Sequence, residues 1–261
     1  WKTKTIHLSC GSSDETGLED QSVDLVVTDP PFFDNVHYSE LADFFHAWQS
    51  LYPRGFVTDA ATTRHPREVQ DTEADQFAEK LGRVFAECRR VLKDEGLLVF
   101  TYHHSRPEGW SSLAQAIYGA GFSVVQAHPV KAEMSGATPK SQAKEPIQLD
   151  IIFVCQKREQ DPRKPMKPSP ALEQTVALAR DKLNRLRRLG LTLSQNDCRV
   201  TVVSQFLALL GPVPSPQVAV HAVTSCQPGL EEIAAAAFLN THEHASAVAF
   251  ARTERQLTLF A

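Results

Sequence analysis

The stretch Val23-Asp24-Leu25-Val26-Val27-Thr28 is followed at once by Asp29-Pro30-Pro31-Phe32. The first six residues have the apolar, β-branched composition of a buried strand. An acidic residue, two prolines and an aromatic ring then stand at the carboxyl end of that strand, which is where a doubly wound sheet carries its chemistry. The sequence therefore predicts an α/β fold with a functional site centred on Asp29.

The residues from Asp29 to Phe32 have the groups needed to hold a planar amine. Each proline fixes its φ, and Pro31 keeps Pro30 out of helical geometry, so we expect the Pro30 carbonyl to face outward beside the Asp29 carboxylate. Two acceptors that bind both hydrogens of an exocyclic amine favour the pyramidal geometry in which the nitrogen lone pair can attack. Phe32 offers a face for stacking a heterocycle, which is worth roughly 1 to 3 kcal/mol. A plain turn is the competing interpretation of Asp-Pro-Pro, and the preceding strand disfavours it.

The Asp-Pro-Pro-Phe motif resembles the catalytic motif of amino-methyltransferases that use S-adenosylmethionine on adenine N6 or cytosine N4. The longer run TDPPFFDNVHYSELADFF, residues 28–45, is similar to large adenine-specific DNA methylases that carry a DUF1156 region and are associated with phage defence. The similarity extends over about residues 5–158. It implies a Rossmann-like, S-adenosylmethionine-dependent enzyme of restriction-modification or phage defence that methylates adenine N6 of a base flipped out of double-stranded DNA.

This resemblance also implies roles for individual residues. The catalytic residues would be Asp29, Pro30, Pro31 and Phe32, and the substrate-binding residues would be Phe33, Asn35, Tyr38 and His103. His103 and His104 follow a strand pattern that ends at the same sheet edge as Asp29. An equally good interpretation is that one of these two rings packs under the next loop and the other is solvated.

Strand patterns at residues 5–10, 23–28, 97–103, 122–127 and 149–156 alternate with helical periods at 76–92 and 108–118. A further helix is marked by Leu41, Phe44, Phe45 and Trp48, directly after the motif. Alternation of this kind predicts a mostly parallel, doubly wound sheet. The connection over 129–148 has no helical pattern, which suits an antiparallel final strand. In a methyltransferase fold these would be the third to seventh strands.

We predict three parts of the chain: a methyltransferase catalytic portion over 1–158, a Pro-rich basic linker over 159–170 and a helical appendage over 171–261. The appendage has helical periods at 172–189, 200–210 and 230–239. Its first helix carries basic residues, for which a solvated face is favoured over phosphate contact: Arg180, Lys182, Arg185, Arg187 and Arg188.

A glycine-rich turn after the first strand, the usual seat of a nucleotide-type cofactor, is absent from the sequence. The one Gly-x-Gly, at residues 119–121, lies between a helix and a strand and predicts a helix C-cap. The resemblance therefore implies an upstream portion of the same protein that supplies the loop. The start at Trp1, just before a strand pattern, also leads us to expect a longer protein. The remaining contacts to S-adenosylmethionine would come from Cys10, Gly11, Ser12, Ser13 and Asp29, and we expect the chain alone to bind it weakly or not at all.

The composition is that of an ordinary globular protein, with 42% apolar residues and a formal charge of −4. This charge argues against a strongly basic nucleic-acid binder, although a local basic patch is sufficient for DNA contact. The candidates for phosphate contact are Arg64, Arg67, Lys140 and Lys144, each more simply interpreted as solvated loop charge. Five widely separated cysteines predict reduced residues in a cytoplasmic protein. No apolar run reaches about 18 residues, the length of a membrane span.

No metal is expected, because the histidines of His242-Glu243-His244 lack the spacing of a helical zinc pair. Two other functions stay open. An RNA methyltransferase acting on adenine N6 or guanine N2 would use a similar slot. A catalytically silent methyltransferase-like module would bind nucleic acid or a partner protein, and the absent glycine loop favours it for the chain in isolation.

Overall fold

The structure is a computed structural model that describes residues 5–34, 36–51, 61–132 and 147–257, with side chains up to residue 239. Within these residues the strands β1 (Val23–Thr28), β2 (Leu92–Tyr102), β3 (Phe122–Lys131) and β4 (Leu149–Lys157) form one sheet of order β1-β2-β4-β3. β1 and β2 are parallel, and β4 is antiparallel to both β2 and β3. Three strands therefore run in one direction and the last runs against them, which confirms the predicted α/β fold with an antiparallel final strand.

Two details of the strand prediction are wrong. Residues 5–10 are not a strand, and Ile6 and Leu8 are 82% and 94% exposed there. Residues 5–10 form hydrogen bonds with no described strand. β1 pairs only with β2 among the described strands, so the outer edge of β1 is open. The strand predicted at 97–103 also begins earlier, because β2 starts at Leu92, which pairs with Val23 ahead of an irregularity in the register.

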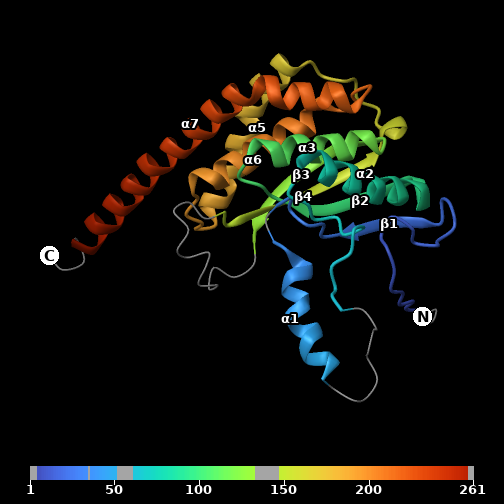
Figure 1. Ribbon diagram of the computed structural model, residues 1–261. Helices are drawn as coiled ribbons and strands as arrows, with labels where there is room; N and C mark the ends of the chain where they lie inside the picture. The colour runs from blue at the N-terminus through green and yellow to red at the C-terminus, as the bar shows by residue number, and fades with distance from the viewer. Residues whose placement is uncertain (1–4, 35, 52–60, 133–146, 258–261) are drawn as a thin grey trace.

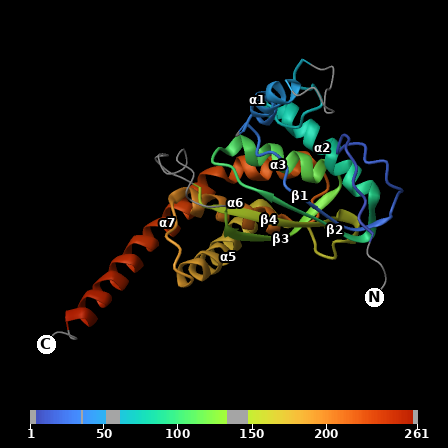
Figure 2. The same ribbon diagram turned by 90° about the horizontal axis from the view of Figure 1, so that it is seen from below.

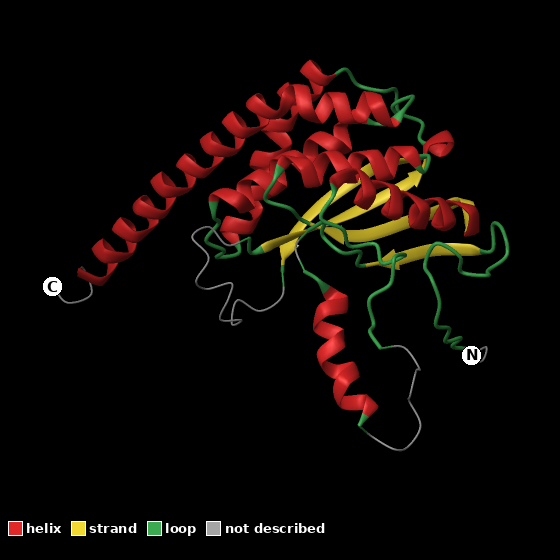
Figure 3. Ribbon diagram, viewed as in Figure 1, coloured by secondary structure: helices red, strands yellow, loops and turns green. Residues whose placement is uncertain are grey.

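The helices of the described chain are α1 (Tyr38–Ser50), α2 (Ala74–Val91), α3 (Pro107–Gly119), α5 (Pro168–Arg188), α6 (Gln195–Leu210) and α7 (Pro216–Leu257), with a short 3-10 turn at Arg158–Gln160. α2, α3, α6 and α7 form a layer on one side of the sheet, whereas α1 extends on the other side (Figures 1 and 3). α3 begins at Pro107, where the fixed φ of proline suits the first turn of a helix. α6 begins with a capping box made by Ser194 and Asp197.

α7 is far longer than the predicted 230–239 segment, and its distal half extends away from the rest of the molecule (Figure 2). Pro228 and Gly229, two residue types that disfavour helix interiors, lie inside α7 just ahead of the predicted segment. The tertiary structure accommodates them. A Cβ on Gly229 would lie 2.6 Å from a methyl carbon of Leu172, so glycine at this position lets α5 approach α7 closely.

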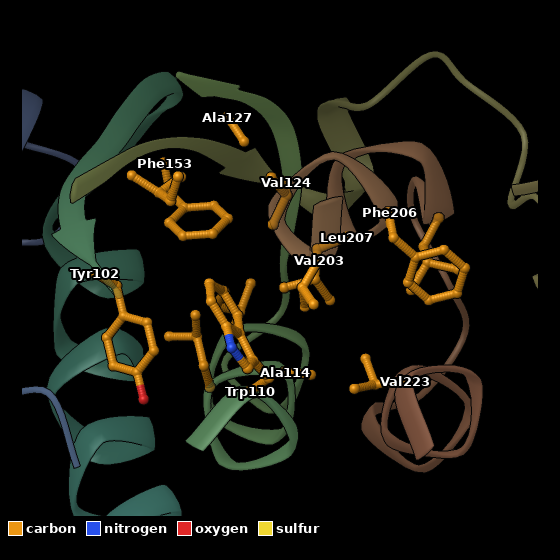
Figure 4. Packing of buried hydrophobic residues seen from close by; sticks show 14 of the residues in the cluster. Tyr102, Trp110, Ala114, Val124, Ala127, Phe153, Val203, Phe206, Leu207 and Val223 are labelled. Carbon is orange, nitrogen blue, oxygen red and sulfur yellow. The ribbon is translucent and has the colours of Figure 1, made fainter. Parts of the chain in front are cut away.

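The core lies between the sheet and the helical layer. Trp110 of α3 packs edge-on against Tyr102 and Phe153, at centroid separations of 5.6 and 6.4 Å. Figure 4 shows the same apolar layer continuing through Val203 and Phe206 of α6 to Val223 of α7. The buried residues of the sheet and of the last three helices therefore form one cluster.

The segment 159–170 is anchored to the sheet. Asp161 is 8% exposed and accepts a hydrogen bond from Ser123 Oγ at 2.7 Å, while Arg163 donates to the same carboxylate. Arg163 also donates to the carbonyls of Val124 in β3 and Ala208 in α6. The segment thus ties α6 to the sheet edge. The division of the chain at 159–170 stays a prediction.

The two faces of the sheet differ in burial: helices cover one face, and the other is largely uncovered by the described helices. Leu98, Phe100 and Tyr102 are fully buried under helices, but the alternate residues of β2 are only partly buried. On β1 the same face carries Leu25 and Val27, which are 52% and 70% exposed. The pairings Val27 with Val99 and Val99 with Val154 make an apolar row across three strands. No described helix packs across this row (Figure 1), which we call the bare face.

Candidate active site

Asp29 lies at the carboxyl end of β1, exposed to solvent. Thr28 pairs with Phe100 in the parallel register, which brings the next residues of the two strands, Asp29 and Thr101, side by side. The Thr101 hydroxyl donates a hydrogen bond to Oδ1 of Asp29. This contact orients the carboxylate and leaves its second oxygen, Oδ2, for another donor.

Phe32 is a fixed, half-buried ring beside this carboxylate. It meets Tyr102 edge-on at a centroid separation of 5.5 Å and His103 edge-on at 4.6 Å. Pro30 is buried and holds the start of the loop. The motif therefore presents an aromatic ring next to an acceptor at the end of the sheet, as the sequence predicts.

Phe33 points into the core and not toward the surface. It is 3% exposed, and its ring lies 5.5 Å from both Phe77 and His104. The Arg106 guanidinium covers it at 5.2 Å from the centroid. Its φ of 51° is unusual for a residue with a side chain, a conformation that costs on the order of 1 to 3 kcal/mol and is held by such packing. This burial favours a supporting role for Phe33 over direct contact with a substrate.

Tyr38 opens α1 and is 51% exposed. Partial burial of its hydroxyl, and then the nearby charge of Asp29, raise the pKa of Tyr38 above its ordinary value. The phenol is therefore close enough to Asp29 to sense its charge. Asn35, the remaining residue expected in the pocket, lies outside the described residues.

The two histidines after β2 have separate partners. His103 is 9% exposed, and its Nδ1 lies 2.5 Å from Oδ1 of Asp150 at the start of β4. His104 is 6% exposed, and its Nδ1 accepts a hydrogen bond from the backbone N–H of Arg106 at 3.0 Å. Burial lowers the pKa of His104. The interpretation with one solvated ring is therefore wrong, because both rings are buried.

The segment expected to contact the cofactor, Cys10 to Ser13, is a surface coil. Cys10 is exposed, and a Cβ on Gly11 would meet nothing within 4 Å. Ser12 donates to Asp14, whose carboxylate also binds Arg67 at 2.7 Å. Gly121 has a φ of +81° at the end of α3, which confirms the predicted helix C-cap. Among the described residues, Cys10 to Ser13 therefore form no enclosed surface against which a cofactor could lie.

Sequence reasoning missed Thr101 and Asp150. Neither residue belongs to a sequence motif. Strand register is the signal that identifies them, because Thr101 lies beside Asp29 of the motif and Asp150 lies beside His103 at the end of β2. A groove of about 800 Å³ lies between α2, α3 and α7. None of Asp29, Phe32, Thr101, His103 and Asp150 lines it.

The basic candidates that the structure describes are paired with acids. Arg64 lies 3.3 Å from Asp43 and 3.7 Å from Glu40, and Arg67 binds Asp14. Lys140 and Lys144 lie outside the described residues. Among the residues that are described, no group of acidic, histidine or cysteine side chains could hold a metal ion, and no helix is long and apolar enough to cross a membrane.

Comparison with known proteins gives one family. The model of the N6 and N4 methyltransferases, described as DNA methylase, matches residues 23–197. No curated protein matches the chain. The matched range begins at β1, contains the Asp29 motif, His103 and Asp150, and ends in the first turn of α6.

Proposed function

The chain belongs to the DNA methylase family, and from this premise we propose that it methylates adenine N6 in double-stranded DNA, with S-adenosylmethionine as the methyl donor. The observation that supports the proposal most strongly is the Asp29 carboxylate, oriented by Thr101 beside the Phe32 ring. A planar amine on a flipped-out base needs an acceptor for its hydrogens and a surface for its ring. Asp29 and Phe32 offer both.

In this proposal each residue of the chain has a defined task. Oδ2 of Asp29 accepts one hydrogen of the amine, and the Pro30 carbonyl accepts the other. Phe32, supported by Tyr102, stacks on the base, while Tyr38 and Asn35 border the pocket and Pro31 fixes the loop. S-adenosylmethionine, when bound, supplies an electrophilic methyl group. Adenine is preferred over cytosine because residues 28–45 resemble adenine-specific methylases, and the DUF1156 association and a role in phage defence are proposed on the same ground.

The part of the site that binds the methyl donor, S-adenosylmethionine, would come from another portion of the same protein. The bare face and the open edge of β1 support this. Leu25 and Val27 are strongly exposed apolar side chains, and the outer edge of their strand pairs with no strand in the described part of the chain. A further strand beside β1 and a helix over the apolar row would bury them. Such a unit would carry the glycine-rich loop, with Cys10, Gly11, Ser12 and Ser13 as additional contacts.

The test replaces Asp29 by Ala and follows transfer of a radiolabelled methyl group to DNA and, in parallel, to RNA. Asp29→Ala should abolish transfer without unfolding the protein, because Asp29 is exposed and its loss leaves no buried group unpaired. Asp24→Ala is the matched control, since Asp24 is an exposed carboxylate on the same strand that binds only Lys93 among its described partners. Substantial activity of Asp29→Ala would overturn the assignment, and transfer to RNA alone would favour the RNA methyltransferase.

A silent module that binds nucleic acid is the second candidate, favoured by the surface coil at Cys10–Ser13. We expect calorimetry to detect weak binding of S-adenosylmethionine to the isolated chain, or none. Tight binding would contradict the proposed division of the site. Failure of the complete protein to methylate either nucleic acid would favour the silent module.

A further inference from the structure

We propose that His103 and Asp150 form a proton-accepting pair in this site, in which Nε2 of His103 accepts the proton that the amine loses on methylation. The inference deepens the proposed function and rests on it. It adds a catalytic residue, His103, and a positioning residue, Asp150, to the acceptor half of the site.

Strand register places the pair next to the motif. Tyr102 pairs with Ile151 in the antiparallel ladder, so the following residue, His103, lies opposite Asp150. Both are on the face of the sheet that carries Thr101, because side chains alternate along a strand. His103 is two residues beyond Thr101, or about 6 to 7 Å along the chain. Asp29, Thr101, His103 and Asp150 thus make a polar row across three strands, at the carboxyl end of the bare face.

The carboxylate selects the tautomer of the ring. With Nδ1 of His103 at 2.5 Å from Oδ1 of Asp150, the proton of the neutral imidazole is on Nδ1. Nε2 then carries a lone pair and is an acceptor. Within the described part of the chain, nothing forms a hydrogen bond with Nε2.

The ring is also in the right place relative to a stacked base. Its centroid is 4.6 Å from that of Phe32, the ring on which the base would lie. Thr101, which precedes it by two residues, binds the carboxylate that would hold the amine. These two contacts put His103 on the same side of the site as the amine that Oδ2 of Asp29 would bind.

The chemical step balances as follows. The amine nitrogen uses its lone pair to form the N–C bond to a methyl group, and the C–S bond of a sulfonium donor breaks with its electron pair going to sulfur. The nitrogen is now cationic. Its proton passes to Nε2 of His103, and the N–H electrons return to nitrogen. The imidazolium that results is stabilised by the Asp150 carboxylate, and it later releases the proton to water.

The same geometry would serve a purely structural clamp between β2 and β4, so the test needs measurements that a clamp would not change. In the complete protein, we expect His103→Gln to lower kcat by about 100-fold or more. Added imidazole should partly restore His103→Ala, which a structural clamp would not do. Asp150→Asn keeps an acceptor for Nδ1 but removes the charge that stabilises the imidazolium, so kcat should fall while the fold is kept.

Two charged or ionisable neighbours of the ring matter for the design. Asp150 binds the ring from β4. His104 lies in the turn that follows; burial lowers the pKa of His104, and the charge of His103 is close enough to lower that pKa further. The control is His128→Gln, a change to another histidine of the same sheet, whose Nε2 lies 2.7 Å from Oε1 of Gln126. It should leave the rate unchanged.

A second readout does not depend on activity. Nitrogen NMR of His103, assigned by comparison with His103→Gln, should show the tautomer with its proton on Nδ1 and an unprotonated Nε2 at high pH. The opposite tautomer would overturn the pair whatever the activity. Full activity of His103→Gln would overturn the pair alone, provided that Asp29→Ala is inactive. A wild-type protein that methylates nothing would overturn the proposed function, and the proton-accepting role with it.

Discussion

Replacing Thr101 by Val tests whether orientation of Asp29 matters for catalysis. The change removes one hydroxyl, which donates a hydrogen bond to Oδ1 of Asp29, and keeps the shape of the side chain. Valine is β-branched and suits a strand, and the site on β2 is only partly buried, so the fold should be unaffected.

The expected magnitude follows from the exposure of the acceptor. A hydrogen bond to a charged group contributes about 1.5 to 3 kcal/mol. Asp29 is exposed, so water replaces part of the lost contact and the lower end of that range applies. About 1.4 kcal/mol corresponds to a tenfold change in rate. We therefore expect Thr101→Val to lower kcat/KM roughly tenfold.

The assay is transfer of labelled methyl groups to double-stranded DNA by the complete protein, together with a thermal unfolding curve. Thr101→Ser is the matched control, because it keeps the hydroxyl and should retain most of the activity. The reasoning is refuted if Thr101→Val is as active as the wild type. It is equally refuted if serine and valine lower the rate to the same extent.

Other predictions concern stability and assembly. Arg90 above all, and then Thr16, hold the pKa of Glu87 at about 2, below its ordinary 4.5. The stabilisation from Glu87 is therefore complete above pH 4.5 and is lost as the pH falls from there through about 2. Glu87→Gln should flatten that part of the acid-unfolding curve, and an unchanged slope would contradict this. Val27→Asp should change the stability of the isolated chain by less than about 0.5 kcal/mol, because the side chain is 70% exposed. In the complete protein it should weaken S-adenosylmethionine binding measured by calorimetry, and unaltered binding would argue against a partner unit on the bare face. Ser194→Ala should lower the free energy of unfolding in urea by about 1 kcal/mol, because it removes the α6 cap; a stability equal to the wild type's would show that water replaces the cap.

The elements that local pattern specifies were predictable from the sequence. The apolar run Val23–Thr28 forms β1, and the amphipathic stripe before Leu92 forms α2. The order of acid, prolines and aromatic ring after β1 located the site at Asp29. These features depend on neighbours in the chain, so periodicity and turn chemistry are sufficient to read them.

Only the tertiary structure decided which residues meet around Asp29. Thr101 is 72 residues away in sequence, and Asp150 is 47 residues from His103; both contacts come from strand register. Register is set by the packing of one whole face of the sheet against α2, α3 and α6, which no single segment encodes. The same packing buried Phe33, which sequence alone assigned to the pocket. Residues 5–10, in contrast, pair with no described strand although the outer edge of β1 is open. The chain thus specifies its strands and helices locally, whereas the polar row of the site forms only where separated strands align.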